Sequence, residues 1–189
     1  MNYPGQDYPS AVAVADVNGD GKLDVVTVNV SSVSVLAGKG NGQLAASVDD
    51  SVDNANVGAF GDLNGDGHLD VVTTNYDTGV VSVLTGKGDG TFGPNAGYPV
   101  GYESRSIVLA DVNGDGRPDI LVLDAGSASF SVLLGNKDGS FASKLDYTTG
   151  IAAVVSWLAA GDLNGDGKID LVVGASSPSA VSVLLNMSR

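Results

Sequence analysis

The sequence contains no cysteine and only one histidine, His68. Disulfide bridges, thiolate metal sites and a cysteine nucleophile are therefore excluded. A single histidine, placed inside a repeated loop, also makes a Ser–His catalytic pair implausible. No stretch reaches the roughly 18–20 apolar residues of a membrane span. Residues 1–10 have neither the basic nor the apolar region of a signal peptide. The sequence as given therefore predicts neither a membrane span nor a signal peptide.

Basic residues are scarce, because 9 Lys and Arg stand against 22 Asp and Glu, for a formal net charge of −13. Nucleic-acid binding is disfavoured, since phosphate contacts need a basic patch. Glutamate is scarcer still, and Glu103 is the only one. Glu suits solvated helices, whereas Asp favours turns and metal loops. With valine-rich runs such as LDVVTVNV, this composition predicts an all-β protein whose natural partner is a cation.

A nine-residue segment, D-x-N-G-D-G-x-x-D, occurs four times, starting at Asp16, Asp62, Asp111 and Asp162. An apolar run precedes each copy, a β-rich run follows it, and a third apolar run comes about ten residues later. Three copies continue into a glycine-rich hairpin signal: GKGNGQL, GKGDGTF and GNKDGSF. A period near 50 residues indicates a repeat architecture such as a propeller. Four antiparallel strands per unit make one propeller blade.

The whole chain, residues 1–189, is predicted to form one β-propeller domain. Its repeats cover about 10–50, 56–100, 105–149 and 156–189. The last unit lacks a fourth strand, and residues 2–9 resemble the fourth-strand segments GYPVG and DYTTG. We therefore expect residues 2–9 to supply the outer strand of the last blade, which covers an exposed edge. The ring is either closed by four blades of one chain or formed by two chains, as a homodimer with eight blades.

Each nine-residue loop presents side-chain oxygens at positions 1, 3, 5 and 9. The predicted side-chain ligands are Asp16, Asn18, Asp20 and Asp24; Asp62, Asn64, Asp66 and Asp70; Asp111, Asn113, Asp115 and Asp119; and Asp162, Asn164, Asp166 and Asp170. The predicted backbone-carbonyl donors at position 7 are Lys22, His68, Arg117 and Lys168. Calcium takes 6–8 oxygen ligands, and this donor set approaches that number. The sequence thus predicts four Ca²⁺ per chain.

The loops have two other possible interpretations. A run of Asx turns without metal explains one copy, but four clusters of three carboxylates would repel unless a cation neutralised them. An EF-hand needs Glu at position 12 and flanking helices, whereas position 12 is Thr27, Thr73, Val122 and Val173 and the flanks are β-branched. The EF-hand interpretation is rejected.

These repeats resemble FG-GAP repeats, also described as VCBS-type repeats, of the integrin α-subunit propeller. The dipeptide Phe60-Gly61 before the second loop and Gly174-Ala175 after the fourth are fragments of the name-giving motif. The resemblance covers nearly the whole chain. It implies a propeller and calcium binding by the side chains named above. Rings of this family usually have seven blades, so four units are a departure.

The resemblance also implies a ligand-binding face opposite the metal loops. Candidate ligand-binding residues there are Asn56, Tyr102, Arg105 and Trp157. A tryptophan near polar side chains suits stacking on a sugar ring. The alternative for Trp157 is packing between blades, and for Arg105 a solvated loop charge. The leading hypothesis is a secreted, calcium-binding propeller that serves as an extracellular binding or adhesion module for a glycan or a protein. The alternatives are a scaffold segment of a larger repeat protein and an accessory domain of a polysaccharide-acting enzyme. The chain itself is not expected to be an enzyme.

Overall fold

The computed structural model describes residues 3, 7–150, 154–177 and 179–188. These residues form fifteen strands and one 3₁₀ turn. The strands are β1 (Ala11–Ala15), β2 (Asp24–Val28), β3 (Ser32–Gly38) and β4 (Leu44–Ser51); β5 (Ala55–Gly61), β6 (Asp70–Asn75), β7 (Val80–Leu84) and β8 (Ala96–Pro99); β9 (Ser104–Ala110), β10 (Asp119–Asp124), β11 (Ser129–Leu133) and β12 (Leu145–Thr148); and β13 (Val154–Gly161), β14 (Asp170–Ser177) and β15 (Ser179–Leu184), with η1 (Ala125–Ser127) after β10. Among the described residues, no helix is long and apolar enough to cross a membrane.

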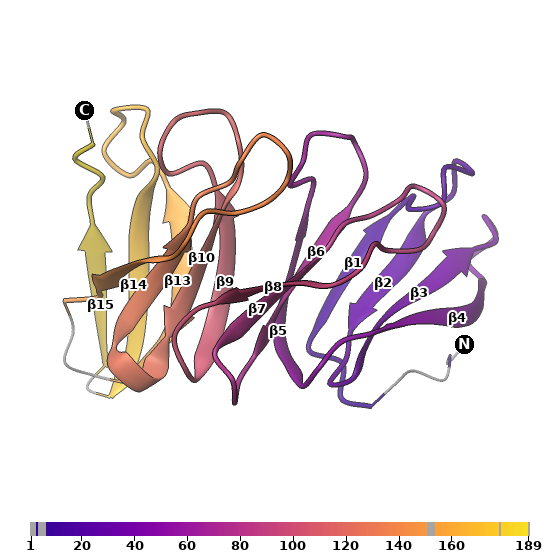
Figure 1. The fold of residues 1–189 in the computed structure, drawn as a ribbon, viewed down its shortest axis with the longest axis horizontal. Coiled ribbons are helices and arrows are strands. Elements are labelled where there is room, and N and C mark those ends of the chain that lie inside the picture. The colour runs from indigo at the N-terminus through magenta and orange to yellow at the C-terminus, as the bar shows by residue number, and fades with distance from the viewer. Residues whose placement is uncertain (1–2, 4–6, 151–153, 178, 189) are drawn as a thin grey trace.

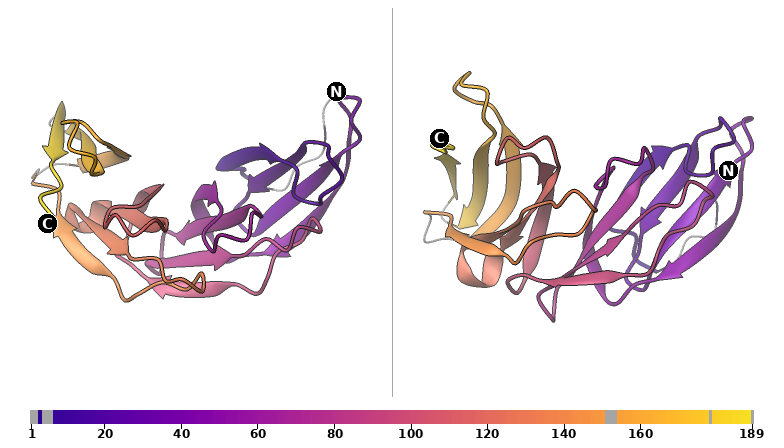
Figure 2. Two further views of the ribbon diagram at one scale, coloured as in Figure 1. Left: turned by 90° about the horizontal axis from the view of Figure 1, so that it is seen from above. Right: turned by 45° about the horizontal axis from the view of Figure 1, so that its top comes forward.

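The strands form four separate sheets, each an antiparallel meander of consecutive strands (Figure 1). The first three sheets have four strands, and the described residues of the last sheet form three. This arrangement confirms the all-β propeller-type fold expected from the repeats. Seen from above, the sheets follow one another along an open crescent (Figure 2). The described sheets do not close into a ring, and the two termini lie at opposite ends of the crescent.

Neighbouring sheets pack face to face. We call the side of a sheet that is turned toward the following sheet its forward face, and the other side its backward face. Along the strands, alternate residues point to opposite faces, and both faces of the inner sheets are apolar. Three clusters result, one at each junction between sheets. In the second junction, Val72 and Val81 of the forward face of the second sheet pack with Ile120 and Val122 of the third. All four are buried completely.

Two phenylalanines complete the first two junctions. Phe92 and Phe141 follow the third strands of the second and third sheets, where each forms an isolated β-bridge with a glycine (Gly86 and Gly135). Phe92 belongs to the cluster of the first junction, and Phe141 to that of the second. Each phenyl ring therefore packs against the forward face of the preceding sheet. The hairpin signals GTF and GSF thus act in packing between sheets as well as in turning the chain.

Residues 2–9 were expected to pair with the last sheet, and part of this segment, residues 2 and 4–6, lies outside the described residues. The described neighbours contact the first sheet. The Tyr3 hydroxyl accepts a hydrogen bond from the Leu44 backbone N–H at 2.9 Å. The Asp7 carbonyl accepts one from the Val30 N–H at 3.3 Å. In this structure both residues therefore lie at the opposite end of the crescent from β15.

Candidate metal-binding loops

The four nine-residue loops connect the first and second strands of their sheets and project from the same edge of the crescent (Figure 1). The glycines at positions 4 and 6 have positive φ in every loop, for example 75° at Gly114 and 83° at Gly116. L-residues with side chains rarely adopt this conformation, so these glycines allow the chain to wrap tightly. Each loop is therefore a compact turn held at a fixed place on its sheet.

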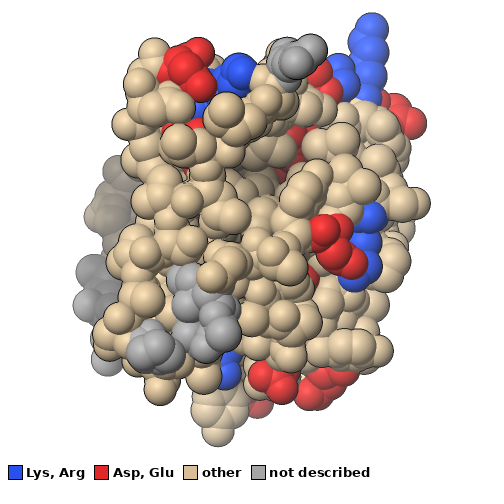
Figure 3. All heavy atoms as spheres, turned by 90° about the vertical axis from the view of Figure 1, so that its left-hand side faces the viewer, with Lys and Arg blue, Asp and Glu red and all other residues tan. Residues whose placement is uncertain are grey.

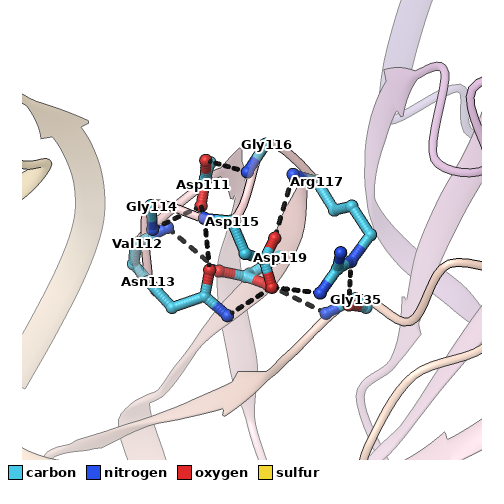
Figure 4. A network of polar contacts seen from close by, with 9 residues as sticks. All are labelled: Asp111, Val112, Asn113, Gly114, Asp115, Gly116, Arg117, Asp119 and Gly135. Carbon is cyan, nitrogen blue, oxygen red and sulfur yellow. Dashed lines mark hydrogen bonds and ion pairs between the residues drawn. The ribbon is translucent and has the colours of Figure 1, made fainter.

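The aspartates at the start of each loop bind the backbone of the loop itself. In the third loop, Asp111 accepts hydrogen bonds from the N–H groups of Gly114 (2.8 Å) and Gly116 (2.7 Å) (Figure 4). Asn113 accepts from the N–H of Asp115 at 3.0 Å. Asp115 accepts from the N–H of Arg117, also at 3.0 Å. The same bonds recur in the first, second and fourth loops. Positions 1, 3 and 5 are thus fixed in one orientation in all four copies.

The aspartate at position 9 has a different environment, because it is fully buried in every loop. One oxygen of Asp119 accepts from the Val112 N–H at 2.9 Å, and the other from the Gly135 N–H at 2.8 Å. Asp24, Asp70 and Asp170 make the equivalent pairs. Each carboxylate therefore ties its loop to the end of the third strand. This structural role adds to the ligand role predicted from the sequence.

Burial raises the pKa of both Asp70 and Asp119 above the ordinary value for aspartate. Backbone N–H bonds counteract the shift, but the carboxylates at positions 1 and 5 add to it. Neighbouring negative charges disfavour ionisation. The effect of positions 1 and 5 on the pKa of position 9 therefore shows that the acidic groups of one loop lie close enough to interact. A bound cation would relieve the same repulsion.

Position 7 supplies cationic side chains in three loops. The Lys22 ammonium contacts the Asp20 carboxylate at 2.9 Å, and the Arg117 guanidinium contacts Asp115. The hydrogen bonds from Lys22 lower the pKa of Asp20. Lys22 and Arg117 partly neutralise position 5 of their loops, whereas the Lys168 ammonium contacts the Ser188 carbonyl. The predicted use of the position 7 carbonyls of Lys22, His68, Arg117 and Lys168 stays a prediction.

The donor chemistry of the loops fits calcium. All candidate side-chain donors are oxygens, and an oxygen that accepts one N–H still has a lone pair for a hard cation. Figure 4 shows Asn113, Asp115 and Asp119 gathered within the turn of the third loop. The described residues contain no ready-made group of three or more acidic or histidine side chains placed to hold a metal. Ca²⁺ would bind the lone pairs that the present hydrogen bonds of these side chains leave free.

The candidate ligand-binding residues do not form one site. Asn56 and Arg105 lie at irregularities in the first strands of the second and third sheets, and both are exposed. Asn56 donates a hydrogen bond to the Ser104 carbonyl at 3.1 Å, which brings these two positions together. Tyr102 is exposed in the connection before β9. These three residues lie near the edge opposite the metal loops.

Trp157, like Asn56 and Arg105, lies in the first strand of its sheet, but it points to a different place. Trp157 lies in β13, where it pairs with Gly174. Two register irregularities of β13 fall before Trp157, the second of them at Ser156, and the tryptophan shares the forward face of the last sheet with Gly174. A shift of one residue in a strand moves a side chain to the other face, and the loop spacing alone did not reveal it.

Asp124 is a buried carboxylate that the sequence did not single out. It is completely buried at the end of β10 and accepts a hydrogen bond from the Ser131 hydroxyl at 2.7 Å. Its Oδ1 has no hydrogen-bond partner among the described residues. Burial raises the pKa of Asp124 to about 6, against the opposing effect of Ser131. The equivalent residues in the first two sheets are Asn29 and Asn75.

We expect Asp124→Asn to stabilise the protein at neutral pH. The folded-state pKa of Asp124 exceeds the unfolded value of 3.8, so its contribution to stability is full below about pH 4 and is lost as the pH rises through about 6. The substitution should add on the order of 2 kcal/mol to the free energy of unfolding at pH 7 and little at pH 4. Urea unfolding at both pH values measures the difference. An equal gain at both values would contradict the assignment.

The chain matches the profile of a known repeat family. The profile of the FG-GAP-like repeat matches three overlapping segments, residues 16–73, 62–122 and 111–173. The chain belongs to the FG-GAP-like repeat family. Each matched segment begins at the first aspartate of one loop and extends into the strands after the next. The FG-GAP-like repeats therefore include the loops described above, and the resemblance seen in the sequence is confirmed. No match was found among curated proteins.

Several solved structures share the fold of these FG-GAP-like repeats. A lectin from Agrocybe aegerita that recognises non-reducing terminal N-acetylglucosamine is 24% identical, with a TM-score of 0.61 over 92% of this chain and 51% of that chain. The V. cholerae biofilm matrix protein Bap1 is 22% identical, with a TM-score of 0.50 over 95% and 38%. A Lactobacillus plantarum protein is 14% identical, with a TM-score of 0.55 over 96% and 56%. At these identities the likeness is one of fold. The chain spans about half or less of the length of these proteins.

Proposed function

We propose that this FG-GAP-like repeat chain binds calcium through its four loops and uses the stabilised sheets as an extracellular binding or adhesion module. The observation that carries the proposal is the fourfold recurrence of one oxygen-donor loop with the same hydrogen bonds. Asn or Asp stands at positions 1, 3, 5 and 9 in every copy, although the residues at position 7 differ in chemistry. A turn that needed only Asx bonds would not require three carboxylates in each copy.

Calcium is expected to bind with a stoichiometry of four per chain and to raise the melting temperature. A ligand that binds only the folded state stabilises by RT ln(1 + [L]/Kd). For sites in the range of about 10⁻⁴–10⁻³ M, typical of extracellular modules, 10 mM Ca²⁺ adds about 1.4–2.7 kcal/mol per site. Titration calorimetry of chelator-treated protein measures the stoichiometry, and a thermal melt measures the stabilisation.

The matched variants for this test are Asp115→Asn and Asp89→Asn. Asp115 is at position 5 of the third loop, and its replacement should reduce the stoichiometry from four to three. Asp89 is an exposed aspartate in the turn after β7, and its side chain accepts hydrogen bonds from Thr91 in its own turn. Its replacement should leave calcium binding unchanged. No binding heat, together with equal melting temperatures in calcium and in chelator, would refute the calcium proposal.

We propose a glycan or a protein as the ligand of this module. Support comes from the fold shared with a lectin and a biofilm matrix protein. Within this chain, Asn56, Tyr102 and Arg105 offer exposed amide, aromatic and cationic groups on the edge away from the metal loops. Such groups can bond sugar hydroxyls and stack on a sugar ring. Screening of the calcium-loaded protein against a glycan array tests this proposal, and a Tyr102→Ala variant should lose the signal.

The alternative roles as a scaffold segment or as an accessory domain use the same loops and sheets, and we propose no catalytic activity. His68 is exposed at position 7 of the second loop, next to Gly88. His68 is thus part of a candidate calcium-binding loop.

A further inference from the structure

Asp124 is the one acidic side chain that is buried outside the four metal-binding loops. Among the described residues, the other buried acidic groups are the aspartates at position 9 of the loops. Elsewhere the acidic side chains lie closer to the surface, as Figure 3 shows for one end of the molecule, where several lie beside Lys or Arg. No ion pair of the described residues includes Asp124. A carboxylate is costly to bury without a cation, so the protonation of this group needs an explanation.

The Ser131 hydroxyl lies between two carboxyl groups. Its Oγ is 2.7 Å from Oδ2 of Asp124 and 2.9 Å from Oδ1 of Asp146. A serine hydroxyl has one hydrogen, so it can donate to only one of them. If both carboxyl groups are ionised, one contact brings two oxygens together without a hydrogen between them. Both contacts are hydrogen bonds only when one carboxyl group carries a proton.

The proton belongs on Asp124 rather than on Asp146. Asp146 is exposed, and its two oxygens lie 2.9 and 2.8 Å from the Lys144 ammonium. The hydrogen bond from Lys144 lowers the pKa of Asp146, whereas burial raises the pKa of Asp124 to about 6. A protonated Asp124 donates to Ser131, which is then free to donate to Asp146. When Asp124 loses the proton, it accepts from Ser131 instead, and Asp146 loses that donor.

The first sheet has the same arrangement with a group that cannot lose its donor. Asn29 occupies the place of Asp124, and its amide donates a hydrogen bond to the Ser34 hydroxyl at 2.9 Å. Ser34 is equivalent to Ser131, and each serine pairs in register with an aspartate of the fourth strand. An amide always has N–H groups to donate, whereas a carboxyl group is a donor only when protonated. The comparison therefore favours a donor toward the serine, which a proton supplies in the third sheet.

The backbone of Gly101, in the connection between β8 and β9, covers Asp124 closely. A Cβ on Gly101 would lie 2.4 Å from Cγ of Asp124 and 2.7 Å from its Oδ2. Oδ1 of Asp124 has no hydrogen-bond partner among the described residues. A buried oxygen without a partner costs less free energy in a neutral carboxyl group than in a carboxylate, because a charge needs more solvation. Both observations favour the protonated form.

The charged side chains on the elements around Asp124 lie on two segments. Lys144 and Asp146 belong to β12 and the residue before it, and Glu103 and Arg105 stand at the start of β9. Residues 96–101 and β11 contain no charged side chain. Burial has the largest effect on the pKa of Asp124, and among the charges Lys144 lowers it and Asp146 raises it. Glu103 and Arg105 are exposed. The state of Asp124 is thus coupled to β12.

We propose that Asp124 and Asp146 share one proton through the Ser131 hydroxyl, and that loss of this proton at rising pH weakens the attachment of β12 to β11. With the proton present, a continuous chain of hydrogen bonds runs from β10 through β11 to β12. Without it, the ionised Asp124 takes the hydrogen of Ser131, and the link to Asp146 is lost. All four residues of β12 are exposed, so few other side-chain contacts hold this strand. The third sheet therefore contains a pH-sensitive connection between its strands.

Carboxyl-carbon NMR of the isotope-labelled full chain tests the shared proton at a fixed calcium concentration. The Asp124 carbon should titrate with a midpoint of about 6. The Asp146 carbon should titrate at low pH and respond a second time at the midpoint of Asp124. An Asp124 midpoint near the ordinary 3.8, or an Asp146 carbon without the second response, would overturn the proposal.

Substitutions in the β12 segment test the direct link. Asp146→Asn should lower the midpoint of Asp124, and Lys144→Met should raise it, because these charges act on Asp124 in opposite directions. Asp138→Asn is the matched control, since Asp138 is an exposed aspartate of the same sheet whose side chain accepts hydrogen bonds from Ser140 in its own turn. This control should leave the midpoint unchanged. A shift as large as that of Asp146→Asn would show an effect of net charge alone and would overturn the link.

Hydrogen exchange of the β12 amides tests the release of the strand. After correction for the intrinsic effect of pH, β12 should open about two- to tenfold more often at about pH 7.5 than at about pH 5, as expected for loss of one hydrogen bond. Asp124→Asn should keep the lower opening frequency at both pH values, because its amide remains a donor. Ser131→Ala should show the higher frequency at both. Opening that does not change with pH in the unmodified protein, or still changes in Ser131→Ala, would overturn the switch.

Discussion

Asp119→Ala is expected to lower the free energy of unfolding by about 2–5 kcal/mol, even when calcium is removed by a chelator. The side chain is fully buried, and its two oxygens accept hydrogen bonds from the backbone of Val112 and Gly135. Alanine leaves both N–H groups without an acceptor, at a cost of about 1–3 kcal/mol for each. Removal of a carboxylate with a raised pKa offsets part of that loss.

The control for Asp119→Ala is Asp115→Ala in the same loop. Asp115 is exposed, and its partners lie within the loop. In chelator, Asp115→Ala should change stability by less than about 1 kcal/mol. In calcium, both variants should lose the contribution of the third site. Urea unfolding of both variants in both conditions separates the structural role of position 9 from its role as a ligand. Equal stability of the two variants in chelator would contradict a structural role.

The fold was predictable from the sequence because three independent signals agree. The nine-residue loops recur at a nearly constant period, each lies between apolar runs, and glycine-rich turns follow the third runs. Such agreement between local turn chemistry and strand pattern specifies a meander. The sheets accordingly form from consecutive strands without a crossover.

The orientation of individual side chains was less predictable. Both faces of an inner sheet are apolar, so the sequence of β6 or β10 does not show which residue points forward. Irregular pairing in β9 and β13 shifts the alternation by one residue, so the spacing from the loop does not show which face of the sheet Trp157 occupies. Trp157 is 73% exposed on the forward face of the last sheet, so both interpretations of it stay predictions.

The residues of the candidate metal site were predictable from the sequence, but the different structural roles of its positions were not. The spacing of D-x-N-G-D-G-x-x-D identifies four oxygen donors, yet it does not show that position 9 is buried while positions 1, 3 and 5 face the loop. One partner of Asp119 is Gly135, which is 16 residues away and lies just after β11. Only the paired sheet brings that N–H to the carboxylate.

Phe141→Ala is expected to cost about 3–5 kcal/mol of stability, as is typical for removal of a buried aromatic ring. Phe141 is 7% exposed and packs between the second and third sheets with Leu63 and Val100. Its ring meets that of Tyr98 edge to face at a centroid distance of 5.5 Å, a geometry that contributes beyond the buried area. Alanine would leave a cavity that rigid sheets cannot close.

The comparison with Phe141→Leu and Leu145→Ala makes this prediction specific. Leucine preserves much of the volume but loses the edge-to-face contact, so Phe141→Leu should cost about 1–2 kcal/mol. Leu145, at the start of β12, is 46% exposed, and its truncation should cost less than about 1 kcal/mol. Chemical unfolding in calcium gives all three values. If Phe141→Ala lowered the free energy of unfolding no more than Leu145→Ala, the packing of Phe141 between neighbouring sheets would not contribute to stability.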